Sequence, residues 1–310
     1  MPPDPGASQR RWRPGWPVDL ATTLGPLRRG DRDPCLRIGR GEVWRATLTP
    51  DGPATVHYAR SGDAILATAW GPGREAELEL VPQVLGADDD PRGFAHGAHP
   101  VMAAAWRRFA AGLRITRTGR ALEALAPAIL EQRVTGVESR RAWRWLVVRH
   151  GEPAPGPTPG PESLRVPPEA PRWAQVPSWD FHRAGVDPGR ARALVAAAGR
   201  AAAIEALAGR SPEQACAALA TLPGIGAWTA AEVAVRAWGH VDAVSFGDAH
   251  VARTVTHALT GRLDGDDSTA AELLRPWSGQ RARAVRLLEL HVGPQPRRGP
   301  RATITDHRAR

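Results

Sequence analysis

The sequence predicts a mainly helical protein with an N-terminal α+β domain, on the basis of three observations. Short runs with partly alternating apolar residues, separated by Asp-Gly and Ser-Gly-Asp turns, occur within the first hundred of the 310 residues. Stretches rich in Ala and Leu, with apolar residues three and four positions apart, follow over much of the remaining chain. Between two such stretches, the Pro and Gly residues of LPGIG at 222–226 interrupt the helical pattern.

The N-terminal domain is expected to span residues 16–97 and to combine a small sheet with one helix. The predicted strands cover 42–49, 54–60 and 63–70, and the predicted helix covers 74–86. Residues 1–15 are rich in Pro, Gly and Arg, and this composition is typical of segments that do not fold alone. We therefore expect a disordered basic tail there.

The helical domain is expected to span residues 98–293, with a flexible basic tail at 294–310. Its predicted helices cover 99–113, 121–132, 138–148, 211–222, 227–238, 249–260 and 275–290. Residues 151–171 contain too many prolines for a helix or a strand and favour extended, polyproline-like structure. Trp173 and Trp179 are expected to fill the core, as large aromatic side chains usually do.

The stretch 211–238 predicts two helices joined by a tight glycine hairpin. Ser211-Pro212 is typical of an N-cap followed by the first helical position. After Gly224 and Gly226, helical character resumes at Ala227. The first N–H groups of this second helix have no partners within the helix, and the helix dipole places positive charge there. The hairpin is therefore a favourable site for a phosphate group.

The hairpin sequence LPGIGAWTA, followed by a single aspartate at position 248, resembles the helix-hairpin-helix DNA glycosylase superfamily, and within it bacterial 3-methyladenine DNA glycosylase II. The resemblance covers residues 118–292 specifically and 16–97 loosely. It continues on both sides of 151–171, so we interpret that segment as a surface excursion inside the helical domain. The same hairpin also occurs in DNA-binding proteins that perform no chemistry, and a plain helix–helix turn is a further interpretation.

The composition is consistent with a nucleic-acid partner. The chain carries a formal net charge of +9 and contains no lysine, so arginine supplies every basic side chain. Arginine binds phosphate with two parallel hydrogen bonds and stacks on bases, although genomic base composition also favours it over lysine. The two cysteines are too few for an iron–sulfur cluster, which needs four ligands, and make structural zinc improbable. No apolar run reaches membrane length, so we expect a cytoplasmic monomer.

A base-excising enzyme of this resemblance needs a carboxylate near the sugar. Cleavage of the N-glycosidic bond proceeds through a transition state with positive charge on the sugar ring, which a carboxylate stabilises while orienting water. Asp248 is the residue we expect in this catalytic role. An aspartate at the start of a helix is also a favoured N-cap, and the two roles are compatible.

The flipped base is expected to lie against aromatic side chains. The resemblance places Trp228 and Trp277 in the base pocket, where an indole face attracts a cationic alkylated purine by about 0.5–2 kcal/mol. Glu232 lies one helical turn beyond Trp228, where related enzymes often carry an aromatic residue. This carboxylate faces either solvent or the pocket, and in the pocket it would pair with a cationic or amino-bearing base.

Several further residues are expected at the DNA surface. The DNA-binding residues implied by the resemblance are Gly224, Ile225, Gly226, Arg133 and Arg190. In ILEQRVTG, Arg133 falls at the position that fills the gap left by the flipped base, where the family more often has an apolar side chain. A surface arginine without this role is the alternative. No cofactor is expected, except a monovalent cation held by backbone carbonyls of 221–226.

The absence of lysine predicts a monofunctional enzyme. Bifunctional relatives use a hairpin lysine to form a Schiff base with the sugar, and the corresponding position here is Trp228. The expected activity is hydrolytic removal of an alkylated, 3-methyladenine-like base from double-stranded DNA, leaving an intact abasic strand. The alternative function is non-catalytic binding of damaged or bent DNA through the same hairpin.

Overall fold

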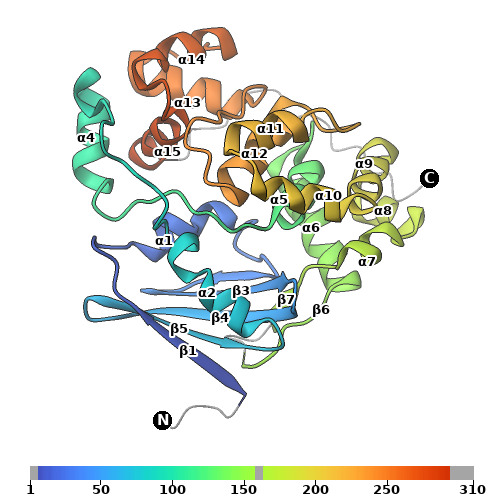
Figure 1. The fold of residues 1–310 in the computed structure, drawn as a ribbon. Helices are drawn as coiled ribbons and strands as arrows, with labels where there is room; N and C mark the ends of the chain where they lie inside the picture. Colours follow the sequence, from blue (N-terminus) through green and yellow to red (C-terminus); the bar gives the residue numbers. More distant parts are fainter. Residues whose placement is uncertain (1–5, 158–162, 294–310) are drawn as a thin grey trace.

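The computed structural model describes residues 6–157 and 163–293, and shows a small sheet packed against a larger helical part (Figure 1). The predicted basic tail at 294–310 lies outside the described residues, as do the first five residues of the chain. Within the described ranges, no helix combines the length and the apolar character needed to cross a membrane.

The sheet has five antiparallel strands in the order β1-β5-β4-β3-β2. In chain order the strands are β1 (Ala7–Trp12), β2 (Leu36–Ile38), β3 (Glu42–Thr49), β4 (Gly52–Ser61) and β5 (Ala64–Trp70). The three predicted strands are confirmed as β3, β4 and β5. The prediction of a disordered tail is wrong for Ala7–Trp12, which pairs with β5 from Ala7 opposite Trp70 to Trp12 opposite Ile65. Composition alone could not reveal a partner strand more than fifty residues away.

Short helices cover one face of the sheet. These are α1 (Leu20–Leu24), the 3₁₀ turn η1 (Gly25–Leu27), α2 (Arg74–Glu79) and α3 (Val81–Val84), and they share a core with β3, β4 and β5. The predicted helix 74–86 is thus two helices, separated at Leu80. Pro82 in the first turn of α3 has no N–H group for a continuous helix, which explains the break.

The proline-rich segment contains regular structure that we did not predict. Strands β6 (Glu152–Pro153) and β7 (Arg165–Val166) pair, and α7 begins at Ala170. Leu164 and Val166 are buried together with Ala46 of β3. These two apolar residues therefore anchor the described part of the segment against the sheet.

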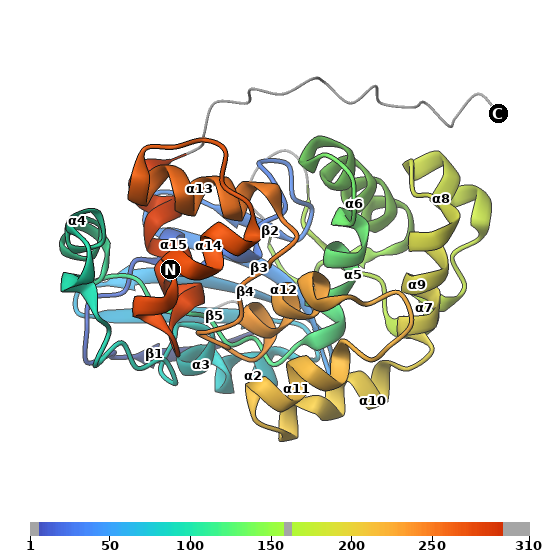
Figure 2. The ribbon, with the colours of Figure 1, turned by 90° about the horizontal axis from the view of Figure 1, so that it is seen from above.

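The helical part contains two hydrophobic clusters. The first is formed by α5 (Ala121–Glu131), α6 (Gly136–His150), α7 (Ala170–Ala174), α8 (Ser178–Ala184), α9 (Pro188–Ala198), α10 (Ala201–Glu205), η3 (Ala206–Gly209), α11 (Pro212–Leu219) and α12 (Ala227–Ala237). The second is formed by α4 (Pro100–Phe109), which the 3₁₀ turn η2 (His96–Ala98) precedes, and by α13 (Ala249–Thr260), α14 (Asp267–Leu273), η4 (Arg275–Trp277) and α15 (Arg281–Val292). Helix α4 therefore packs with helices from the far end of the chain (Figures 1 and 2).

The two tryptophans near the proline-rich segment differ in burial. Trp173 is in the core, as predicted, with 1% of its surface exposed. Trp179 is 64% exposed, so its prediction as a core residue is wrong. Helix α8 instead turns Phe181 and Ala184 inward, and Trp179 lies outside that buried stripe.

Buried ion pairs join the sheet to the helices. Arg45 of β3, 2% exposed, forms pairs with Glu77 of α2 at 2.6 Å and with Glu123 of α5 at 2.7 Å. Arg283 of α15 forms a buried pair with Asp89. A charge left without its partner in such a position keeps its desolvation cost and loses the compensating attraction.

We expect Arg45→Met to lower the free energy of unfolding by about 3–5 kcal/mol, the range for removing one partner of a buried ion pair. Urea unfolding measures this change. Arg92→Met is the matched control, because Arg92 pairs with Asp90 on the surface, where 89% of its side chain is exposed. An Arg45→Met protein as stable as this control would contradict a structural role for the buried pairs.

Candidate active site

The glycine hairpin has the predicted form. Helix α11 ends at Leu219, and α12 begins after Gly226, which caps it without a side-chain hydrogen bond. Gly224 has a φ of +81°, and a Cβ there would lie 2.8 Å from the Cβ of Ala193 in α9. Only glycine combines this backbone conformation with so close an approach. The first amides of α12 consequently lie beside an exposed glycine turn, as anion binding requires.

Ile225 anchors the hairpin from inside, which corrects its prediction as a DNA-binding residue. Its side chain is 3% exposed and belongs to the first helical cluster. Its backbone N–H donates to the carbonyl of Leu222 at 3.0 Å, so this amide is already used within the turn. The exposed residues Gly224 and Gly226 remain the parts of the hairpin that can approach a phosphate.

The loop between α5 and α6 lies against the hairpin. The Nε2 of Gln132 donates to the Gly224 carbonyl and to Oγ1 of Thr229, both at 2.9 Å. Arg133 follows with a φ of +54°, the only positive value at a non-glycine residue within the described chain. Its side chain is exposed, as a gap-filling residue requires. Sequence reasoning assigned no role to Gln132, although it lies in the same motif.

Arg190 supports this loop from within, and the prediction of a phosphate contact is wrong for it. It is 7% exposed, and its guanidinium donates to the carbonyl of Leu130 at 2.7 Å and of Gly185 at 3.2 Å. It also pairs with Asp187, the N-cap of α9. Because its donors are engaged with protein oxygens and its side chain is buried, a DNA phosphate cannot reach it.

Asp248 is the N-cap of α13, with Oδ1 accepting the N–H of His250 at 2.8 Å. Within the described chain, its Oδ2 accepts no hydrogen bond, so one carboxylate oxygen can serve another role. The preceding residue, Gly247, is held because its N–H donates to Asp267 of α14 at 2.6 Å. The cap and the loop contact together fix the position of the Asp248 carboxylate.

Trp228 and the Asp248 segment lie side by side. The Cβ of Trp228 is 3.8 Å from the position that a Cβ on Gly247 would occupy. Trp228 is half-buried, so part of its ring surface stays accessible. The structure therefore places Trp228, which directly follows the hairpin, beside the loop residue that precedes Asp248.

The sequence predicts that Glu232 faces either solvent or the base pocket. In the structure its carboxylate instead bonds to other side chains of the protein. It is 16% exposed, forms an ion pair with Arg236 at 2.9 Å and accepts the Ser245 hydroxyl at 2.5 Å. Burial by itself would raise the pKa of this carboxyl, but Arg236 and Ser245 outweigh that effect and hold the pKa below its usual value. Glu232 is thus an ionised group that ties α12 to the loop leading to Asp248.

Trp277 is a core residue, and its prediction as a second pocket aromatic is wrong. It is 3% exposed, its Nε1 donates to the carbonyl of Ala95 at 2.9 Å, and its ring stacks with that of Phe94. A tryptophan with its indole N–H satisfied inside a packed cluster cannot open to a base without disrupting that cluster.

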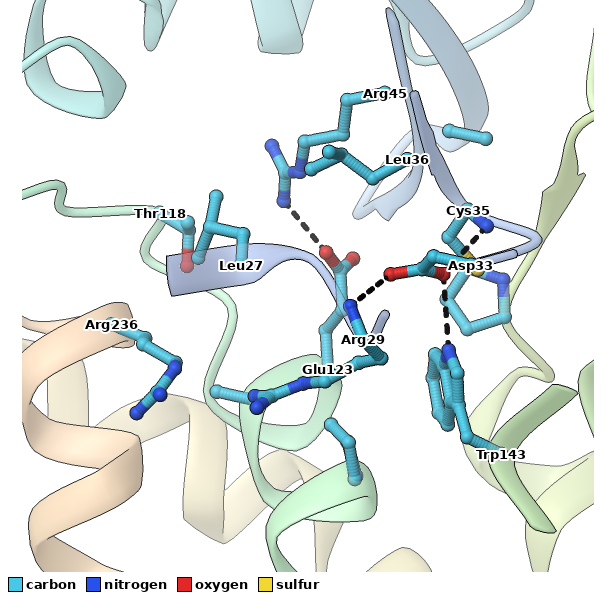
Figure 3. A pocket seen from close by; sticks show the side chains of 14 residues that line it. Leu27, Arg29, Asp33, Cys35, Leu36, Arg45, Thr118, Glu123, Trp143 and Arg236 are labelled. Carbon is cyan, nitrogen blue, oxygen red and sulfur yellow. Dashed lines mark hydrogen bonds and ion pairs between the residues drawn. The ribbon is translucent and has the colours of Figure 1, made fainter. Parts of the chain in front are cut away.

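A cavity of about 40 Å³ lies between the sheet and helices α5, α6 and α12 (Figure 3). Its lining includes Asp33, whose carboxylate accepts the backbone N–H groups of Arg29 and Cys35 and the indole N–H of Trp143. Burial raises the pKa of Asp33 despite these bonds. The space is close to that of a single water molecule, far below that of a nucleobase.

The cation predicted at the hairpin stays a prediction. Of the carbonyls at 221–226, that of Gly224 already accepts Gln132 and that of Leu222 accepts Ile225. Within the described ranges, no group of three or more His, Cys, Asp or Glu side chains is arranged to hold a metal ion.

The arrangement was compared with known proteins. No family model and no curated protein matches the sequence. Among solved structures, a 3-methyladenine DNA glycosylase from Archaeoglobus fulgidus is 19% identical, with a TM-score of 0.75 over 91% of this chain and 98% of the other. The structure of MBOgg1 in complex with a low-affinity DNA ligand is 16% identical, with a TM-score of 0.69 over 93% and 96%.

A third solved structure extends the comparison to another glycosylase. The 8-oxoguanine glycosylase/lyase from Clostridium acetobutylicum, in complex with double-stranded DNA containing cytosine opposite 8-oxoguanine, is 12% identical, with a TM-score of 0.66 over 92% and 98%. The chain therefore has the fold of the helix-hairpin-helix DNA glycosylases, with the N-terminal sheet and helical part that the sequence predicts.

We expect Gly226→Ala to weaken binding to every DNA duplex alike, by about tenfold, because the added methyl group would separate the α12 amides from a phosphate. Fluorescence anisotropy with undamaged and damaged duplexes measures the effect. Apart from Gly226 and its chain neighbours, no atom of the described residues lies within 4 Å of the new Cβ, so the fold should be unaffected, and Gly209→Ala is a control with the same open space. A loss confined to one lesion would place Gly226 in base recognition instead.

Proposed function

We propose that this protein is a monofunctional DNA glycosylase that flips a damaged base out of double-stranded DNA and hydrolyses its N-glycosidic bond. The observation that supports the proposal is that Asp248 is the N-cap of α13 and that its neighbour Gly247 lies beside Trp228. The hairpin at 222–226 supports it, because a phosphate site next to these residues would hold the strand that carries the flipped nucleotide.

Each part of the site then has a defined task. The exposed amides of the hairpin bind the DNA backbone, and Arg133 fills the space vacated by the base. The face of Trp228 stacks on the extruded base. The free Oδ2 of Asp248 stabilises the positive charge that develops on the sugar and orients the attacking water.

The substrate class follows from what the site offers. An alkylated purine such as 3-methyladenine carries positive charge, so it leaves without a general acid and is attracted by the face of an indole ring. Glu232 contributes little to recognition of that charge, because Arg236 already neutralises it. The partner is double-stranded DNA in the cytoplasm, bound by a monomer.

A non-catalytic binder of damaged or bent DNA is the second candidate. The observation that favours it is the N-cap bond from Asp248 to His250, which explains this aspartate without any chemistry. Incubation of the protein with methylated duplex DNA, followed by mass spectrometry of the released bases, distinguishes the two functions. Release of free base supports the glycosylase, and binding without any release supports the alternative.

We expect Asp248→Asn to lower the rate of base release by at least about 10²-fold while DNA affinity is retained, since the loss is that of transition-state stabilisation. The amide oxygen still accepts the His250 N–H, so α13 keeps its cap. Single-turnover release from methylated duplex measures the rate.

The matched control is Asp266→Asn, which alters the N-cap aspartate of α14. It should change neither release nor affinity. Near-normal turnover by a folded Asp248→Asn protein would exclude the mechanism.

We expect no covalent complex when the protein is treated with borohydride on substrate DNA. A Schiff base needs a neutral amine, and arginine side chains stay protonated at any working pH. Strand breaks should appear only after added alkali or an abasic-site endonuclease, as checked on a denaturing gel. A robust adduct would reveal an amine other than a lysine side chain, because the sequence contains none.

A further inference from the structure

We propose that Gln132 is a positioning residue that couples the phosphate-binding hairpin to the loop carrying Arg133. The hairpin binds the DNA backbone, and the hydrogen bonds from Gln132 to the hairpin then fix the position from which the Arg133 side chain enters the base stack. The inference rests on the proposed function and assigns to the site a residue that touches neither the base nor the sugar.

The contacts of Gln132 span the hairpin. One N–H of its side-chain amide reaches the carbonyl of Gly224 in the turn, and the other reaches Oγ1 of Thr229 in the first turn of α12. Thr229 is 2% exposed, so its hydroxyl belongs to the interior. Both bonds use the NH₂ group, which supplies exactly two donors. A carboxylate or an apolar side chain of the same shape cannot replace it.

The coupling holds Arg133, the residue after Gln132, in place. Arg133 has the left-handed backbone conformation, which is unfavourable for a residue with a Cβ and persists where its neighbours fix it. Gln132 fixes it on one side. On the other side, the side chains of Thr135 and Glu138 form a capping box that begins α6. Within the described residues, Arg133 itself makes no hydrogen bond or ion pair, so its side chain is available to DNA.

Helix α9 contacts both the loop after α5 and the hairpin. Arg190 donates to the Leu130 carbonyl just before the loop, and Ala193 packs against Gly224 of the hairpin. These supports are independent of Gln132, so the loop and the hairpin keep their own structures without it. Without Gln132, the position of the loop relative to the hairpin is no longer fixed. The role of Gln132 can therefore be tested separately from folding.

The test uses Gln132→Met, which keeps the length of the side chain and removes both donors. We expect a lower melting temperature, because the buried Thr229 hydroxyl loses its partner, but a folded protein with unchanged affinity for undamaged duplex, because the hairpin amides are intact. Affinity for a duplex containing a tetrahydrofuran abasic analogue should fall about tenfold, because Arg133 is no longer held in place before the DNA binds. For base release, kcat should fall while KM stays within about twofold.

Gln175→Met is the matched control, because Gln175 is an exposed glutamine at the end of α7, outside the site. It should leave both affinities and kcat unchanged. If Gln132→Met does not fold, Thr229→Val removes one of the two bonds and should lower the affinity for the abasic duplex by a smaller factor in the same direction.

A double-mutant cycle with Arg133→Ala decides the mechanism. With Gln132 present, Arg133→Ala should lower affinity for the abasic duplex, and with Gln132→Met it should cost little more. Additive losses, or equal losses on undamaged and abasic duplexes, would overturn the proposal. These affinities need no excision, so a wild-type protein that releases no base contradicts the proposed function and leaves the coupling measurable.

Discussion

Helix α5 is buried on nearly all sides. Its terminal N–H and carbonyl groups therefore need hydrogen-bond partners from the rest of the protein. Nine of its eleven residues are buried, so water reaches few of its terminal N–H and carbonyl groups. At its start, the Glu205 carboxylate accepts the N–H groups of Ala121 and Leu122 at 2.9 and 2.8 Å. Burial raises the pKa of Glu205 although both amides and Arg120 stabilise its charge. The first N–H groups of this buried helix are thus bound by a side chain from a distant part of the sequence.

The contacts that complete this helix also place the functional parts. At its C-terminal end, Arg190 donates to the Leu130 carbonyl, and the side chain of Gln132, the C-cap residue, donates to the hairpin carbonyl of Gly224. In its first turn, Glu123 forms the ion pair with Arg45 and so joins the sheet to the helical core. Stability and the geometry of the candidate site consequently depend on the same few polar contacts. The bond from Arg190 to Leu130 is shielded from water, which strengthens it, whereas the bond from Gln132 to Gly224 is exposed.

The site itself lies where the two helical clusters meet. Trp228 comes from α12 of the first cluster, and Asp248 begins α13 of the second. Two side-chain contacts, Glu232 to Ser245 and Asp267 to the Gly247 amide, hold the connecting loop from both sides. The loop residue before the Asp248 cap therefore lies beside the Trp228 side chain of the other cluster.

The sequence by itself determined the hairpin, the helical phases around it, the N-cap aspartate and the lack of a lysine nucleophile, because each is a property of neighbouring residues or of composition. Only the tertiary structure decided the partners. Arg190 turned inward, Trp277 entered a core, and Ala7–Trp12 joined a sheet edge. Arginine and tryptophan combine apolar surface with polar groups, so either can lie in the interior when its polar groups find partners there. Which of the two they occupy depends on acceptors and strands that lie far away in the chain.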